Sequence, residues 1–199
     1  MSELSNAKTI GKVGSLLALL GGFVPLIGPI IGIVGFVLVL IAVKSISELL
    51  KDKDIFRNYI VDFILSIISI VMILVIMLMG FFNVGGFTWI TSLQDINIQD
   101  LSTFWDYFGG IISYAIMALI VGWILWVIGA IYLRRSYNSI AKYTNVSLFR
   151  TTGTVYLIGA ITTIILIGFV ILFVGRIIEV ISYFSLPDEL PIDDIKTKK

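Results

Sequence analysis

The stretch from Phe63 to Gln94 contains no Lys, Arg, Asp or Glu. A helix rises about 1.5 Å per residue and a bilayer core is about 30 Å thick, so this stretch can cross a membrane. Soluble domains carry roughly 25% charged residues, whereas this chain carries 14%, with 58% hydrophobic residues. The sequence therefore predicts a multi-span membrane protein of the all-α class.

The flanks of this stretch differ in charge, which gives it a direction. Cations precede it and carboxylates follow it: Lys51, Lys53 and Arg57 before, and Asp95, Asp100 and Asp106 after. Because cytoplasmic loops are enriched in Lys and Arg, the basic flank is expected inside the cell.

The apolar runs predict one membrane domain, residues 1–186, with about five transmembrane helices, followed by a polar tail, 187–199. The helices are expected at about 5–24, 29–50, 55–82, 107–133 and 152–184. Three glycines and two prolines between Gly21 and Pro29 break the first apolar region into a hairpin. Residues 14–43 could instead form one kinked span, but the hairpin keeps Lys8, Lys12 and Lys44 on one side.

Whether the first helix crosses fully is left open at this point. The N-terminal stretch lacks a small-x-small cleavage site and is expected to be retained. No fixed-period repeat is evident. The layout places the N-terminus in the cytoplasm and the C-terminus outside, with most cations inside and four outside: Arg176, Lys196, Lys198 and Lys199.

Four segments together resemble one known family: Ala7–Gly14 (AKTIGKVG), Asp54–Asn58 (DIFRN), Leu148–Gly153 (LFRTTG) and Tyr156–Ala160 (YLIGA). With them the chain resembles the DUF996 family of small integral membrane proteins, found largely in archaea. The resemblance runs from about Ala7 to about Pro187. It implies a membrane location and a shared fold, and it carries over no activity and no functional residues.

Asp62 is the acidic residue closest to the charge-free stretch, and an ionisable group inside a membrane is by default a functional hypothesis. The plainer interpretation, which we favour, pairs Asp62 with Arg134 or Arg135 at the cytoplasmic edge. The alternative is a role for Asp62 in proton or ion relay. Arg176 and Glu179, three residues apart, are expected to form an ion pair at the outer interface.

Small residues spaced for close helix contact are the other candidate positions. They are Gly28, Gly32, Ala115, Ala118, Gly122, Gly129, Gly168 and Gly175. Packing within one chain is the favoured interpretation, and packing against another subunit is the alternative.

The chain has no Cys and no His, which excludes disulfides, His or Cys metal sites and His general bases. No catalytic, cofactor or metal site is predicted. The leading hypothesis is a non-enzymatic accessory or structural subunit of the cell membrane, in contact with lipids and with a homo-oligomer or larger complex, and not with nucleic acid. The alternative is a channel or transporter for a small solute or ion, because the broken hairpin resembles discontinuous transporter helices. Against this alternative, the spans contain few polar residues that could line a path for a solute or ion.

Overall fold

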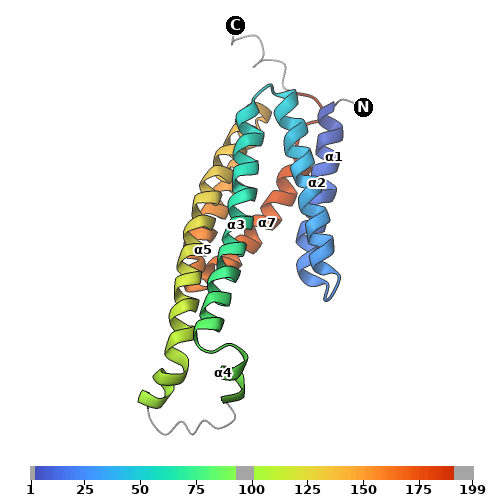
Figure 1. Cartoon of the computed structure of the whole chain (residues 1–199). Helices are drawn as coiled ribbons and strands as arrows, with labels where there is room; N and C mark the ends of the chain where they lie inside the picture. Colours follow the sequence, from blue (N-terminus) through green and yellow to red (C-terminus); the bar gives the residue numbers. More distant parts are fainter. Residues whose placement is uncertain (1–2, 93–100, 191–199) are drawn as a thin grey trace. The chain divides into compact units, whose positions relative to one another are not determined.

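The computed structural model describes residues 3–92 and 101–190, which are helical apart from short connections and contain no strand (Figure 1). This confirms the expected all-α bundle. The helices are α1 (Glu3–Leu20), η1 (Gly21–Phe23), α2 (Gly28–Leu49), α3 (Lys53–Asn83), α4 (Phe87–Ser92), α5 (Leu101–Thr144), α6 (Ser147–Thr162), η3 (Thr163–Ile165) and α7 (Ile167–Phe184).

Five helical segments among the described residues are long and apolar enough to cross a membrane. They are α2, α3, residues 108–144 of α5, α6 with η3, and α7. Helix α1 is not among them, because its 18 residues include Glu3, Lys8 and Lys12. The number of candidate spans agrees with the prediction, but the helices counted are different. The last predicted helix is two helices in the structure, and the first predicted helix is not among the candidate spans.

The described chain divides into two compact units. The hairpin unit comprises residues up to Phe63 and from Val127 onward, and the long-helix unit comprises Ile64–Trp126. Within the long-helix unit, α3 and α5 are in direct contact. The Ser69 hydroxyl of α3 donates a 2.8 Å hydrogen bond to the Gly122 carbonyl of α5. The rings of Trp89 and Phe108 meet edge to face there, 6.0 Å apart.

The first hairpin, α1 with α2, forms as predicted, which rules out the single kinked span (Figure 1). The two backbones approach so closely that a side chain on Gly35 would overlap the backbone of Gly14 and Ala18. Because lipid supplies no hydrophobic drive between helices, such close contact is the main source of attraction between them.

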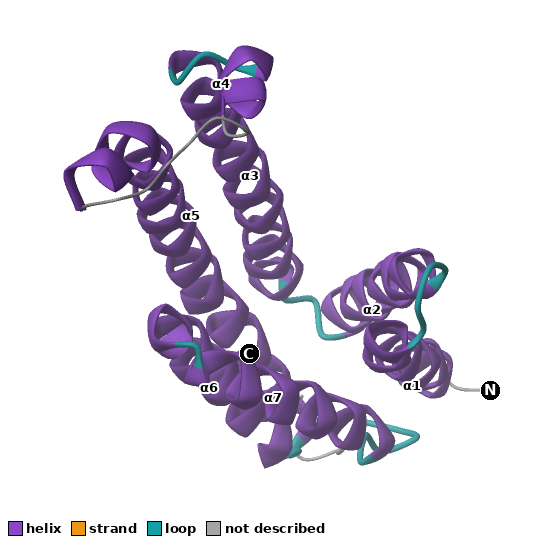
Figure 2. Cartoon of the chain, turned by 90° about the horizontal axis from the view of Figure 1, so that it is seen from below, coloured by secondary structure: helices purple, strands orange, loops and turns teal. Residues whose placement is uncertain are grey.

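The predicted helix over 152–184 is wrong, because the chain reverses within it. α6 ends at Thr162, and α7 begins after Leu166, whose φ of 64° lies in the left-handed region. The Thr162 and Thr163 hydroxyls donate to the carbonyls of Ile158 and Gly159, the local bonding by which Thr competes with helix continuation. α6 and α7 therefore form a second hairpin (Figure 2).

Other boundaries shift as well. Helix α5 begins before residue 107 and runs to Thr144 rather than ending at 133, because its last turns bury a continuous stripe with Tyr137, Ile140 and Ala141 against the core. Helix α4 occupies part of the predicted outer connection. The rest of that connection, 93–100, and the tail after residue 190 lie outside the described residues.

The two hairpins share one sequence and backbone pattern, which the search for a fixed-period repeat did not reveal. Leu26-Ile27-Gly28 in the first matches Leu166-Ile167-Gly168 in the second, each after a short 3₁₀ turn and each with its Leu at φ 64°. The same register aligns the buried positions: Val39, Ala42, Val43 and Ile46 of the first hairpin with Glu179, Ser182, Tyr183 and Leu186 of the second. With only two copies, this repeat shows no period along the chain.

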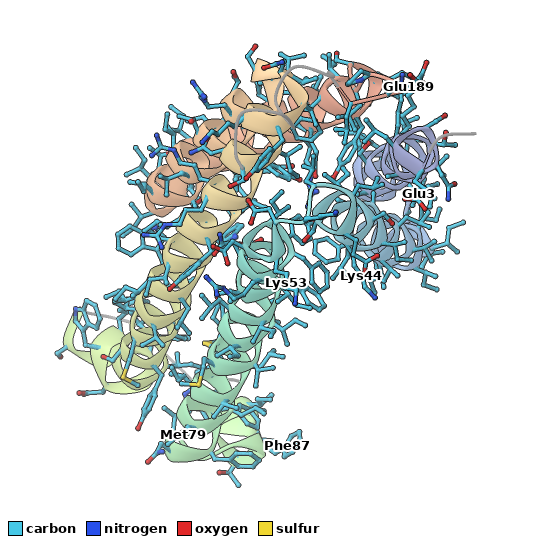
Figure 3. All side chains as sticks on the ribbon, turned by 90° about the horizontal axis from the view of Figure 1, so that it is seen from above. Glu3, Lys44, Lys53, Met79, Phe87 and Glu189 are labelled. Atoms are coloured by element: carbon cyan, nitrogen blue, oxygen red, sulfur yellow. The ribbon has the colours of Figure 1, made fainter. Side chains whose placement is uncertain are left out.

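The start of α1 and the end of α7 lie at the same end of the hairpin unit, near the labelled Glu3 and Glu189 (Figure 3). Lys8 Nζ is 2.8 Å from Asp188 Oδ1, and this hydrogen bond and the charge of Lys8 lower the pKa of the Asp188 carboxyl. The Lys12 ammonium lies 4.9 Å from the Phe184 ring centroid. This ion pair holds the start of α1 and the residues that follow α7 at one end of the hairpin unit.

Cysteine labelling in membrane vesicles checks this arrangement, because the chain has no native cysteine. Glu3→Cys and Glu189→Cys are expected to react with an impermeant maleimide from the same face, and Leu166→Cys from the opposite face. Reaction of Glu3→Cys and Glu189→Cys from opposite faces would restore the single last helix.

Leu166 provides a second check, through the sign of a stability difference. In the left-handed conformation Gly is favoured over Ala by about 1 kcal/mol or more, whereas inside a helix Ala is favoured over Gly by about 1 kcal/mol. Thermal unfolding in detergent is therefore expected to rank Leu166→Gly above Leu166→Ala. The reverse order would mean that the helix continues through this position.

Candidate intramembrane charge site

Glu179 is the centre of a polar cluster inside the hairpin unit. Its side chain is 1% exposed, and both carboxylate oxygens are occupied. Oε1 accepts a 2.5 Å hydrogen bond from the Tyr137 hydroxyl, and Oε2 accepts a 2.6 Å bond from the Tyr156 hydroxyl. Because Tyr137 belongs to α5 and Tyr156 to α6, one carboxylate of α7 joins three helices.

Arg176 completes the coordination of this carboxylate. Its Nη1 donates to Glu179 Oε2 at 2.8 Å, which confirms the predicted pair three residues apart on one helix face. Its guanidinium also lies 5.5 Å from the centroid of the Tyr156 ring, a cation–π distance. The expected setting was wrong: the carboxylate is buried among three helices, because the reversal at Leu166 turns α7 back toward the end of α5.

Aromatic rings enclose the cluster. Phe149 meets Tyr137 and Tyr183 edge to face, with centroids 5.6 and 5.2 Å away, and Tyr59 of α3 lies 6.1 Å from Tyr137. The Tyr183 hydroxyl is fully buried and makes no hydrogen bond within the described part of the chain. A buried hydroxyl without a partner is uncommon and marks a position with unused bonding capacity.

Asp62 is 8% exposed and lies three residues after Tyr59 on α3, whose ring is 6.1 Å from Tyr137 of the cluster. Arg176 and Glu179 are the charged groups that act on its carboxyl. Across residues 3–92 and 101–190 it forms no ion pair with Arg134 or Arg135. Both arginines are exposed, and the Arg135 guanidinium lies 5.3 Å from the Tyr132 ring centroid.

The hairpin repeat shows that the cluster is not a packing requirement. Glu179, Ser182 and Tyr183 occupy the positions of Val39, Ala42 and Val43 in the first hairpin, and all six residues are buried. The first hairpin packs with apolar side chains at these positions. The second hairpin therefore carries one carboxylate and two hydroxyl groups at positions where the first hairpin carries apolar side chains.

The small residues of the hairpins mostly face their own chain. A side chain on Gly28 would overlap Gly21, one on Gly168 would overlap Gly159 and Thr163, and one on Gly175 would press on Tyr156. These positions therefore serve packing within each hairpin. Gly32 differs, because a Cβ added there meets nothing among the described residues.

The small residues of α5 follow the same rule. Gly122 lies against Ile73 and Ser69 of α3 in the long-helix unit, so a side chain there would collide with them. Ala118 and Gly129 are buried, and Ala115 is half-buried. A subunit contact is not needed to explain the predicted small residues. Even Gly32 packs within its own hairpin, because a Cβ added to Gly21 would come within 2.6 Å of the Gly32 nitrogen.

Sequence reasoning missed most of this site. It singled out Asp62 and the Arg176–Glu179 pair separately, and it did not connect them with Tyr137, Tyr156 or Tyr183. One signal was available: the repeated Leu-Ile-Gly and Val-Gly steps align Glu179 with Val39. Within the described residues no group of three or more Asp or Glu is placed to hold a metal.

Two tyrosines with equally buried rings test the network. Tyr137→Phe removes a hydrogen bond to a buried carboxylate and is expected to lower the free energy of unfolding by about 1.5–3 kcal/mol. Tyr183→Phe removes a hydroxyl without a partner and is expected to leave stability unchanged or slightly raised. Thermal unfolding of both variants in detergent measures this difference. Equal losses of stability in Tyr137→Phe and Tyr183→Phe would contradict the assigned hydrogen bonds.

Comparison with known proteins places the chain in a family without assigning an activity. The family model described as "Protein of unknown function (DUF996)" matches residues 31–177. An uncharacterized protein of the methanogen Methanocaldococcus jannaschii is 33% identical over 188 residues, covering 94% of this chain and 96% of that protein. No solved structure matches. The resemblance seen in the sequence is thus confirmed, and the chain belongs to the DUF996 family.

Proposed function

We propose that this multi-pass membrane protein is a channel or transporter for a small ion or solute, acting without covalent catalysis. The observation that carries the proposal is the buried charge site, in which Asp62, Arg176 and Glu179 lie among tyrosines inside the hairpin unit. Ionisable groups held in the interior of membrane helices are costly and commonly mark ion or substrate pathways.

The duplicated hairpin supports the same class of function. Many secondary transporters are built from internal repeats, with the site formed where helices are interrupted. Here both copies interrupt the helix before Leu-Ile-Gly, and only the second copy carries the charged side chains. The apparent shortage of polar residues came from counting spans one at a time, whereas the fold gathers polar groups of four helices.

The orientation that accompanies this proposal places both ends of the described chain in the cytoplasm. The two hairpins then open toward the cytoplasmic side, and their Leu26 and Leu166 turns face outward. This orientation requires α1 to reach the outer side together with the five apolar segments, which makes six crossings. The charges support this orientation, because the following cations fall together on the inner side: Lys8, Lys12, Lys44, Lys51, Lys53, Arg57, Arg134, Arg135, Lys142 and Arg150.

The leading hypothesis from the sequence, an accessory or structural subunit, remains the second candidate. Gly32 is the position that bears on it: this half-buried glycine of α2 has open space, among the described residues, where a side chain would project. A small residue at such a position lets another helix approach closely.

A flux assay in sealed vesicles tests the proposal. Purified protein is reconstituted, and the dissipation of imposed H⁺, Na⁺ and K⁺ gradients is followed with ion-sensitive dyes. Wild type is expected to dissipate at least one gradient, and Asp62→Asn is expected to lose most of that flux because the site loses its ionisable carboxyl. The matched control is Asp54→Asn, an exposed acidic residue of the same helix that pairs with Arg57.

The outcomes separate the two candidates. Equal flux from wild type and Asp62→Asn would show that the ion does not pass through the charge site. No flux from any variant, together with a protein partner that remains bound at constant stoichiometry through purification in mild detergent, would favour the accessory subunit.

A further inference from the structure

The charge site has an unbalanced negative charge when its groups are ionised. Asp62 and Glu179 contribute two negative charges, and Arg176 contributes one positive charge. Arg176 is already used by Glu179, which it contacts at 2.8 Å. An uncompensated charge in a low-dielectric interior costs several kcal/mol, so the site requires one further positive charge.

Asp62 is where that charge is missing. Glu179 has both oxygens satisfied by three donors. Asp62 is nine-tenths buried and has neither a hydrogen bond nor an ion pair within the described part of the chain. Among the described residues, the charged groups that act on the Asp62 carboxyl are Arg176 and Glu179, and Tyr59 lies one turn earlier on the same helix.

A second group near the cluster also has unused bonding capacity. The fully buried Tyr183 hydroxyl makes no hydrogen bond of good geometry in the described residues, although the Tyr137 hydroxyl and the charges of Glu179 and Arg176 act on it. The groups that face the site are therefore Tyr59 and Asp62 from α3, Tyr137 from α5, Tyr156 from α6, and Arg176, Glu179 and Tyr183 from α7.

We propose that this site binds one proton, at the Asp62 carboxylate, with the Arg176–Glu179 pair as its fixed counter-charges. A proton balances the charge by forming a single O–H bond. A bare alkali cation would need several oxygen ligands, and the tyrosine hydroxyls of α5 and α6 already donate to Glu179. The inference deepens the proposed function, on which it rests for its physiological use, by naming the ion.

Infrared spectroscopy of the full chain in lipid nanodiscs tests this directly, without any transport measurement. A neutral carboxylic acid has a carbonyl band distinct from that of a carboxylate, and it shifts in heavy water. Wild type is expected to show this band at neutral pH. Solvent-exposed carboxyl groups have pKa values of about 4 and are ionised at that pH, so they do not contribute to the band. Asp62→Asn is expected to lose the band completely, and Asp54→Asn is expected to keep it.

Each other outcome overturns the proposal. Absence of the band in wild type would show that Asp62 stays ionised, and persistence of the band in Asp62→Asn would place the proton elsewhere. Loss of the band on addition of Na⁺ or K⁺ at constant pH would make the ligand an alkali cation. A band that behaves as expected, combined with no ion flux, would keep the proton site and remove the transport proposal.

Discussion

The Glu179 carboxylate joins α5, α6 and α7, and the arrangement of the second hairpin depends on how its charge is accommodated. Burying a carboxylate costs several kcal/mol, and that cost is offset only when good hydrogen bonds and an opposite charge surround it. Tyr137, Tyr156 and Arg176 supply both. They can do so because the chain reverses at Leu166 and brings α7 back along α6.

The duplicated hairpin separates what the fold needs from what the site adds. In the first copy Val39 and Val43 fill the buried face, and the close approach of Gly14 and Gly35 holds the helices together. The second copy keeps this geometry but replaces apolar side chains with charged and hydroxylated ones. Since the same packing is achieved without polar groups, their presence is best explained by function. That explanation concerns the site alone, because membership of the DUF996 family brings no activity with it.

Parts of this architecture were predictable because their signals are local. The Gly21–Pro29 break predicted the first hairpin, since glycine and proline interrupt helices wherever they occur together. The second reversal has no such marker: residues 162–167 are Thr and aliphatic residues that a hydropathy pattern interprets as continuous helix. Missing it placed α7 in one continuous helix with α6 and separated Glu179 from Tyr137.

The sequence by itself predicted apolar helices long enough to cross a membrane, and it showed which end of the first long helix is basic. These properties follow from composition, because a charge-free run must avoid water and a lipid-exposed backbone must satisfy its own hydrogen bonds. Only the tertiary structure decided that Asp62 is buried and forms no ion pair with Arg134 within the described residues, and that three helices share the Glu179 carboxylate. Contacts between residues far apart in the chain depend on the direction in which each helix returns. For α7, the left-handed backbone conformation of the single residue Leu166 sets that direction.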